Sequence, residues 1–171
     1  MAKDKYERPL FILFTLNVIF LIWAILWKCG VPSIGNETQR AINILPFNGN
    51  TRWEMQFNIL LFVPFGFYLS AAMPKSKIVK LFLFTALASV ILEIAQYILA
   101  VGRSDITDVL LNTVGGGIGI AAFYTLSKLF DKHSRKAVMF VCILIIAFEL
   151  YMSTSFILFG QVRLGHVIFR L

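Results

Sequence analysis

Long apolar runs separated by short polar segments dominate the pattern of this sequence. Each run is close to the roughly 20 residues that a helix needs to cross about 30 Å of hydrocarbon. The runs occupy residues 10–27, 51–73, 78–101, 104–129 and 137–159. This pattern predicts an all-α, polytopic membrane protein, a bundle of five transmembrane helices. Since almost nothing is left over for a soluble domain, we expect residues 1–171 to form a single membrane domain.

The first run is expected to stay in the protein as a membrane span. Basic residues precede it, as they precede the apolar segment of a signal peptide. The run is long for such a segment, however, and no A-x-A-like cleavage site follows it.

Polar and small residues inside the third and fourth runs fall on one face of each helix. At about 100° per residue, the polar and small positions of the third run lie within a stripe about 80° wide, and those of the fourth within about 100°. The third-run positions are Ala86, Ser89, Glu93, Gln96 and Ala100, and the fourth-run positions are Asp105, Asp108, Asn112, Gly115, Gly116 and Gly119. Little more than Gly102 and Arg103 joins the two runs, which predicts an antiparallel hairpin with both stripes facing each other. The glycines would allow close helix packing, and the acids and amides would form a polar wedge at the other end.

The segment before the second run is predicted to be a long loop outside the membrane. Thr51 and Glu54 have the spacing of a helix capping box, and residues 48–50 are typical of a turn. Residues 41–50 are too apolar to prefer water, so we expect this loop partly to re-enter the membrane or to lie on its surface or at the bundle mouth. Pro64 and Gly66 would kink the second helix, as an ordinary kink or as a gate.

Composition and charge fix the class and the orientation. The chain is 58% hydrophobic with a mean hydropathy of +0.79, well above the level of soluble domains. Ten of the sixteen Lys and Arg residues flank the predicted spans on one side and six on the other, which predicts a cytoplasmic N-terminus and an external C-terminus. The net charge of +7 is spread over separate segments, which suits anionic membrane lipids and not nucleic acid.

Cysteine and histidine positions argue against two common kinds of site. In this topology Cys29 lies outside and Cys142 within the inner half of the fifth span, so no disulfide joins them. His133 and His166 lie on opposite sides of the membrane, and no H-E-x-x-H, P-loop or G-x-S-x-G motif is present. Zinc and a serine–histidine pair are therefore not expected.

Three chemistries are open to the polar wedge. Its carboxylates and amides could bind a hard cation, with Glu93, Asp105 and Asp108 as the candidate ligands, could hold a phosphate beside Arg103, or could form a polar network without a ligand. Asp105 and Asp108 could equally serve the helix start, with Ser104 as N-cap and Arg103 neutralising them.

Acidic and amide side chains also lie deeper in the membrane. For Glu93, about 12 Å below the helix end, we favour a functional role over a buried pair with Arg103. Glu149 lies at a comparable depth, where pairing, protonation and ligand contact are equally open, and Asn17 is expected to form an interhelical hydrogen bond.

Three segments resemble one known family. NILPFNGN, NILLFVPFGFYL and EIAQYILAVGRSDITDVLLNTVGGGIG, which run in order from Asn43 to Gly119, are similar to the VanZ-like family. The resemblance implies a bacterial plasma-membrane protein that reduces susceptibility to the glycopeptide antibiotic teicoplanin, with no implied reaction. The family's motif positions correspond here to Asn43, Pro46, Phe47, Asn58, Pro64, Gly66, Glu93, Gln96, Arg103, Asp105, Asp108, Asn112, Gly115 and Gly116.

The first functional hypothesis is a non-enzymatic binding module with an external pocket. It would engage a lipid-linked wall precursor, its peptide stem or the lipid-anchored drug, a lipoglycopeptide. Arg103 would pair with phosphate or carboxylate, and Phe47 with Trp53 would line the apolar rim. The expected ligand-binding residues are Asn43, Phe47, Asn58, Glu93, Gln96, Arg103, Asp105, Asp108 and Asn112.

Two other classes stay open. A membrane enzyme could modify a lipid headgroup or wall precursor with Glu93 or Asp108 as acid or base, and a divalent cation is the one cofactor it could need. A transporter is less favoured, because the glycine-rich inner half is expected to be packed shut and no internal repeat is present.

Overall fold

The computed structural model describes residues 5–26, 41–159, 161–164 and 167–170. Five long helices account for most of them: α1 (Glu7–Leu26), α2 (Arg52–Ala72), α3 (Ile78–Leu99), α4 (Ile106–Phe130) and α5 (Ser134–Phe159). A short 3-10 helix, η2 (Asp131–His133), joins α4 to α5. Cys29 and His166 lie outside the described residues, as do Lys3, Lys28 and Arg40, three of the sixteen basic residues counted for the orientation.

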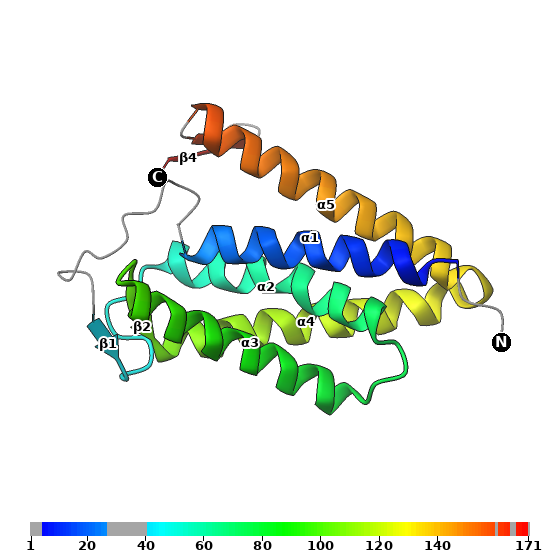
Figure 1. Cartoon of the computed structure of the whole chain (residues 1–171), viewed down its shortest axis with the longest axis horizontal. Coiled ribbons are helices and arrows are strands. Elements are labelled where there is room, and N and C mark those ends of the chain that lie inside the picture. The colour runs from blue at the N-terminus through cyan, green and yellow to red at the C-terminus, as the bar shows by residue number, and fades with distance from the viewer. Residues whose placement is uncertain (1–4, 27–40, 160, 165–166, 171) are drawn as a thin grey trace.

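The helices have the length and apolarity of membrane-spanning segments. Within the described residues, four segments meet both criteria: Glu7–Leu26, Arg52–Ala72, Ile78–Leu99 and Ile106–Ser155. The last segment contains α4 and α5, which run in opposite directions on either side of η2 (Figure 1). The helical membrane bundle is therefore confirmed, whereas the count of five spans and their orientation stay predictions.

The two ends of the bundle differ in what they contain. The start of α1, the α2–α3 connection and η2 lie together at one end, and the starts of α2 and α4 lie at the other (Figure 1). At the second end β1 (Ala41–Asn43) pairs in parallel with β2 (Arg103–Asp105), with Ala41 opposite Arg103 and Asn43 opposite Asp105. A separate antiparallel hairpin, β3 (Gln161–Leu164) and β4 (Val167–Arg170), follows α5. The 41–50 segment is thus fastened to the α3–α4 connection.

The sequence around the starts of α2 and α4 explains where these helices begin. The Thr51 hydroxyl accepts a hydrogen bond from the Glu54 N–H, and the Glu54 carboxylate accepts one from the Thr51 N–H, so the predicted capping box is present. The predicted N-cap of α4 was wrong by one residue. Asp105, not Ser104, accepts from the Thr107 N–H, because Ser104 belongs to strand β2.

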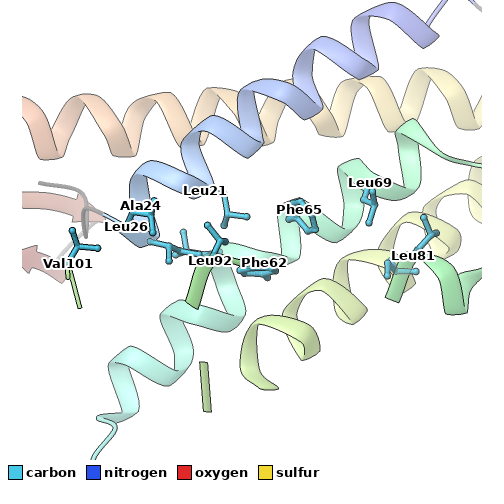
Figure 2. Close-up of a cluster of buried hydrophobic side chains, with 12 residues drawn as sticks. Leu21, Ala24, Leu26, Phe62, Phe65, Leu69, Leu81, Leu92 and Val101 are labelled. Atoms are coloured by element: carbon cyan, nitrogen blue, oxygen red, sulfur yellow. The ribbon is translucent and has the colours of Figure 1, made fainter. Parts of the chain in front are cut away.

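Buried apolar side chains of α1, α2 and α3 form the main core. Leu21, Phe62, Phe65 and Leu92 lie close together between these helices (Figure 2). A second cluster, which includes Leu10, Phe67, Phe123 and Val138, joins α1 and α2 to α4 and α5. Large apolar side chains on the outer faces of α1, α3 and α5 are exposed, as expected for surfaces that contact lipid.

The glycines of α4 pack mainly against α2. A Cβ on Gly115 would overlap the Ile59 carbonyl, and one on Gly119 would overlap the Val63 carbonyl. The polar and small stripe of α4 contains three buried glycines, Gly115, Gly116 and Gly119. Among these three, a Cβ would overlap an α3 residue only at Gly116, where it would meet the Thr85 side chain. The predicted glycine seam between α3 and α4 was therefore largely wrong, because its close backbone approach is to α2. Pro64 lies inside α2, which continues as a helix on both sides of it.

Candidate functional site

A cavity of about 520 Å³ opens at the end of the bundle that carries β1 and β2. We call it the polar cavity, because charged and amide side chains make up much of its wall. Its lining residues come from α1, the segment before α2, α2, α3, β2 and α4. They are Ala24, Ile25, Gly49, Asn50, Glu54, Phe57, Asn58, Leu61, Glu93, Gln96, Arg103, Asp105, Asp108 and Asn112.

Most of the predicted site residues meet in this cavity. Seven of them line it: Asn58, Glu93, Gln96, Arg103, Asp105, Asp108 and Asn112. They come from three helices and a strand that are separated along the chain. Helical spacing brings them together, because positions three and four apart on α3 and α4 project from the same face.

Glu93 is held at the base of β2 by a backbone hydrogen bond. Its side chain is only 4% exposed, although it lies within a long apolar helix. The backbone N–H of Asp105 donates to Glu93 Oε2 at 2.8 Å, so the carboxylate satisfies a buried backbone donor. The stripe prediction for α3 is confirmed at this position, and also at Ser89 and Gln96, which are buried as well.

Asp105 is the centre of the hydrogen-bond network at the cavity mouth. Arg103 Nη2 lies 2.8 Å from its Oδ2, and Asn43 Nδ2 and Asn50 Nδ2 donate to the same oxygen at 2.9 and 3.2 Å. Burial opposes ionisation of this carboxyl. The hydrogen bonds from Asn43, Thr107 and Asn50 outweigh that effect and hold the pKa of Asp105 below its ordinary value.

Arg103 forms its ion pair with Asp105. The alternative of a buried pair between Glu93 and Arg103 does not describe this arrangement, since Glu93 instead accepts from the Asp105 N–H. The Arg103 side chain is 42% exposed, so it lies at the rim of the cavity and not in its depth. Neutralisation of Asp105 by Arg103, one of the predicted alternatives, is present.

Three residues that the sequence placed in the ligand pocket lie elsewhere. Asn43 does not line the polar cavity, and its amide supports Asp105 from β1. Phe47 and Trp53 are 61% and 65% exposed and also lie outside the lining. Phe47 has a positive φ of 61°, and its N–H donates to Thr107 Oγ1 at 2.9 Å, which fastens the loop to α4.

Two buried amides in the wall each have one end committed to the protein. Gln96 Nε2 donates to the Ile25 carbonyl of α1 at 3.1 Å, and Asn112 Nδ2 donates to Ser89 Oγ at 2.9 Å. The two side chains are only 6% and 1% exposed. Within the described residues, neither Gln96 Oε1 nor Asn112 Oδ1 accepts a hydrogen bond, and the same holds for Asn50 Oδ1. Buried acceptors without donors are costly, so these oxygens need a ligand or water.

Several lining residues were not predicted. Glu54 was interpreted only as a capping residue and Asn50 only as part of a turn, yet both line the cavity. Gly49 belongs to the same turn, and its Cβ position would lie 3.5 Å from Arg103 Nη1. Their proximity to Arg103 and Asp105 could not be read from the sequence, because it depends on the β1–β2 pairing of segments about sixty residues apart.

A metal site finds no geometric support among the described residues. No group of three or more His, Cys, Asp or Glu side chains in residues 5–26, 41–159, 161–164 and 167–170 is arranged to hold a metal ion. Glu93, Asp105 and Asp108 share the cavity wall without forming such a group.

A second buried acid lies away from the cavity. Asn17 Nδ2 of α1 donates to Glu149 Oε1 of α5 at 2.6 Å, and Glu149 is 3% exposed. The interhelical hydrogen bond predicted for Asn17 is present. The Glu149 carboxyl is thus paired with an amide, whereas protonation and ligand contact stay open.

The fold and the cavity together define a class: a small helical membrane protein with an acid-rich polar cavity at one end of its bundle. A family model described as VanZ/LLP1 matches residues 11–131. The chain is also 36% identical over 147 residues to Protein VanZ of Enterococcus faecium. The aligned region covers 83% of this chain and 91% of that protein. The chain belongs to the VanZ/LLP1 family. No solved structure matches it.

The family match confirms the resemblance and extends it. The three segments that carried the resemblance end at Gly119, whereas the matched region also includes most of α1 and the rest of α4. The α1 residues of the cavity wall, Ala24 and Ile25, therefore lie within the family region as well.

Proposed function

We propose that this protein reduces the susceptibility of bacteria to teicoplanin-type glycopeptides as a binding module of the plasma membrane. One observation carries the proposal. Seven site residues that the resemblance and the helical stripes selected line a single cavity. Membership of the VanZ/LLP1 family supports the resistance function.

An external position of the cavity is part of the proposal. The basic residues expected in the cytoplasm lie at the start of α1, between α2 and α3, and around η2, at the end opposite the cavity (Figure 1). Positive segments tend to stay in the cytoplasm, which favours an outward-facing cavity. Glycopeptide drugs act on that face of the membrane.

The size of the cavity limits what it can hold. A volume of about 520 Å³ is within the usual range of small-molecule sites, about 300–1,000 Å³, and is too small for an entire glycopeptide. Apolar side chains of Ile25, Phe57 and Leu61 form part of the wall beside the acids. We propose that one moiety enters: part of a lipid-linked wall precursor, of its peptide stem, or of the lipid-anchored drug.

Drug susceptibility of cells that express single-residue variants tests the proposal. Glu93→Gln, Arg103→Ala and Asp108→Asn should each remove protection against teicoplanin while the protein still inserts at normal abundance. Lys128→Gln, near the opposite end of α4, serves as the control and should keep protection. Full teicoplanin tolerance in all three cavity variants would exclude a role for the cavity.

The proposed orientation has a test of its own. In a Cys29→Ser background, a membrane-impermeant thiol reagent applied to whole cells should label a cysteine introduced at Asn48, in the loop at the cavity end. It should not label one introduced at Ser76, between α2 and α3. The reverse labelling pattern would place the cavity in the cytoplasm and contradict the proposal.

A membrane enzyme is the second candidate function. It is favoured by one observation: Glu93 and Asp108, the two proposed acid/base residues, line the same cavity. Mass spectrometry of envelope lipids and wall fragments, with and without the protein, discriminates between the two. A new or missing species that depends on Glu93 would support the enzyme. Unchanged chemistry beside altered binding of labelled drug would support the binding module.

A further inference from the structure

The charges of the polar cavity do not match those of a phosphate ligand. Among the described residues, four carboxylates line it, those of Glu54, Glu93, Asp105 and Asp108, against one cation, Arg103. Arg103 Nη2 lies 2.8 Å from Asp105, so that cation already compensates one of the acids. The part of the lining that the structure describes contains no second Lys or Arg. A phosphate would face an excess of negative charge, whereas a cation would be attracted.

The hydrogen-bonding capacity of the wall points to the same kind of ligand. The amide oxygens of Asn50, Gln96 and Asn112 accept no hydrogen bond within the described residues. Gln96 and Asn112 are more than nine-tenths buried and both line the cavity. Oxygen atoms of this kind need donors, which an ionised phosphodiester lacks.

The protein itself fixes the direction of two of these amides. Gln96 donates through Nε2 to the Ile25 carbonyl, which can only accept, so its oxygen is turned away from that partner. Asn50 donates through Nδ2 to Asp105 Oδ2 and is fixed in the same way. The acceptor oxygens of Gln96 on α3 and of Asn50 in the loop before α2 are thus buried and, within the described residues, without a donor, in residues that line the cavity.

We propose that the polar cavity binds a protonated primary amine. An alkylammonium group carries one positive charge and three N–H donors, which complement the excess carboxylates and the amide oxygens. The apolar side chains of Ile25, Phe57 and Leu61 would contact the carbon chain that bears it. The inference rests on the proposed function, because it names the group by which the wall precursor, its peptide stem or the drug would be recognised.

A ligand with N–H donors is favoured over a metal ion. The described residues contain no group of three acidic, histidine or cysteine side chains arranged around a metal position. Charge alone would admit any cation, but the amide oxygens favour a ligand that presents several donors.

Binding of small probes to the full chain in phosphatidylcholine nanodiscs tests the inference. n-Butylammonium should raise the thermal unfolding midpoint. At equal ionic strength, tetramethylammonium, which has the charge but no N–H donors, should raise it far less, and inorganic phosphate should not raise it. If tetramethylammonium, phosphate or Mg²⁺ stabilises the protein as much as n-butylammonium, the inference is wrong.

Variants link the binding to the cavity. Glu93→Gln should weaken n-butylammonium binding at least about tenfold, the effect of about 1.4 kcal/mol at one charged contact. Glu149→Gln, the same substitution at an equally buried acid outside the cavity, should leave binding unchanged. If Glu93→Gln fails to fold, Asp108→Asn takes its place with the same expectation. Equal binding to the cavity variant and the control would overturn the inference.

Competition experiments identify the source of the amine. A wall peptide with a free lysine amine should displace n-butylammonium if the peptide stem is the ligand, and its N-acetylated form should not. Phosphatidylethanolamine in the nanodisc should displace it if a lipid headgroup is the source. Equal displacement by the free and acetylated peptides would contradict amine recognition.

Failure of the amine inference can be told from failure of the proposed function. If cavity variants lose drug protection while n-butylammonium does not bind, the amine inference fails and the proposed function stands. If n-butylammonium does not bind and the cavity variants also keep drug protection, both fail.

Discussion

Glu93 and Glu149 are two buried acids in long apolar helices, and their surroundings differ. Glu93 lies in the wall of the polar cavity with Gln96, Asp108 and Asn112. Glu149 is not part of that wall and contacts the Asn17 amide between α1 and α5. Both are buried to nearly the same extent, at 4% and 3% exposed. Burial of an acid in a membrane helix is therefore a weak indicator of a ligand site unless a polar cavity accompanies it.

The helices that carry the two acids are also held together differently. α2 and α4, which contribute to the polar cavity, approach so closely that a Cβ on Gly115 or Gly119 would overlap backbone carbonyls. α1 and α5 contain no glycine. Two helices of the cavity wall are thus held by close backbone contact deeper in the bundle, and the Glu149 region depends on side-chain packing and one buried hydrogen bond.

The largest predicted effect separates the two acids by function. Glu93→Gln should lower teicoplanin resistance to the level of cells that lack the protein, because the cavity loses a charge that nothing else replaces. Glu149→Gln should keep resistance, since a glutamine can still accept from Asn17. Minimal inhibitory concentrations at matched protein abundance measure both. If only the Glu149 variant lost resistance, Glu149 and not Glu93 would be the functional acid, and the prediction would be wrong.

The next largest effect concerns the backbone contact between α2 and α4. Gly119→Ala should destabilise the protein by about 1–3 kcal/mol, because the added Cβ meets the Val63 carbonyl and cannot be accommodated by a side-chain rotation. Gly117→Ala is the matched control. Its Cβ would lie 3.2 Å from the Phe82 ring, which can shift. Thermal unfolding in detergent compares them, and equal midpoints would mean that α2 and α4 are not held by this contact.

A smaller effect is expected in the Glu149 region. Asn17→Leu removes the hydrogen bond that the Glu149 carboxyl accepts from Asn17 Nδ2 and should cost about 1–3 kcal/mol of unfolding free energy. The double variant Asn17→Leu with Glu149→Met should recover most of this loss, because a buried polar pair can be replaced by apolar groups of similar size. Resistance should persist in the double variant. An unchanged unfolding midpoint in Asn17→Leu would show that the hydrogen bond contributes nothing.

The comparison also shows what the sequence could predict. Apolar run lengths predicted the helices to within a few residues, since 51–73 became Arg52–Ala72 and 78–101 became Ile78–Leu99. The helical wheel predicted which side chains of α3 and α4 turn inward, and Glu93, Gln96 and Asn112 are buried. Periodicity is a property of one helix, so it defines the buried face.

Periodicity does not define which neighbour that face contacts. Adjacent positions along the chain suggested that the glycines of α4 pack on α3, but their backbone approach is to α2. The parallel pairing of β1 with β2 was not predicted either, because strands of three residues carry no readable alternation. Periodicity also does not show which loop residues reach the cavity. The sequence therefore placed Phe47 in the pocket and left Glu54 out of it.

The smallest predicted effect is the pH dependence of the cavity mouth. Because the pKa of Asp105 is lowered in the folded protein, its carboxylate contributes stability at neutral pH, above the ordinary value of about 3.9. That contribution is lost as the pH falls through the lowered pKa.

Asp105→Asn should therefore be less stable than the parent chain at neutral pH. The difference should be about 1 kcal/mol or less, since the partner Arg103 is 42% exposed and screened by solvent. It should shrink as the pH falls from about 4, where the carboxyl of the unfolded chain takes up a proton, through the lowered pKa of the folded protein. Unfolding midpoints of both proteins across this range measure the change, and a difference that grows on acidification would reverse the sign assigned to Asp105.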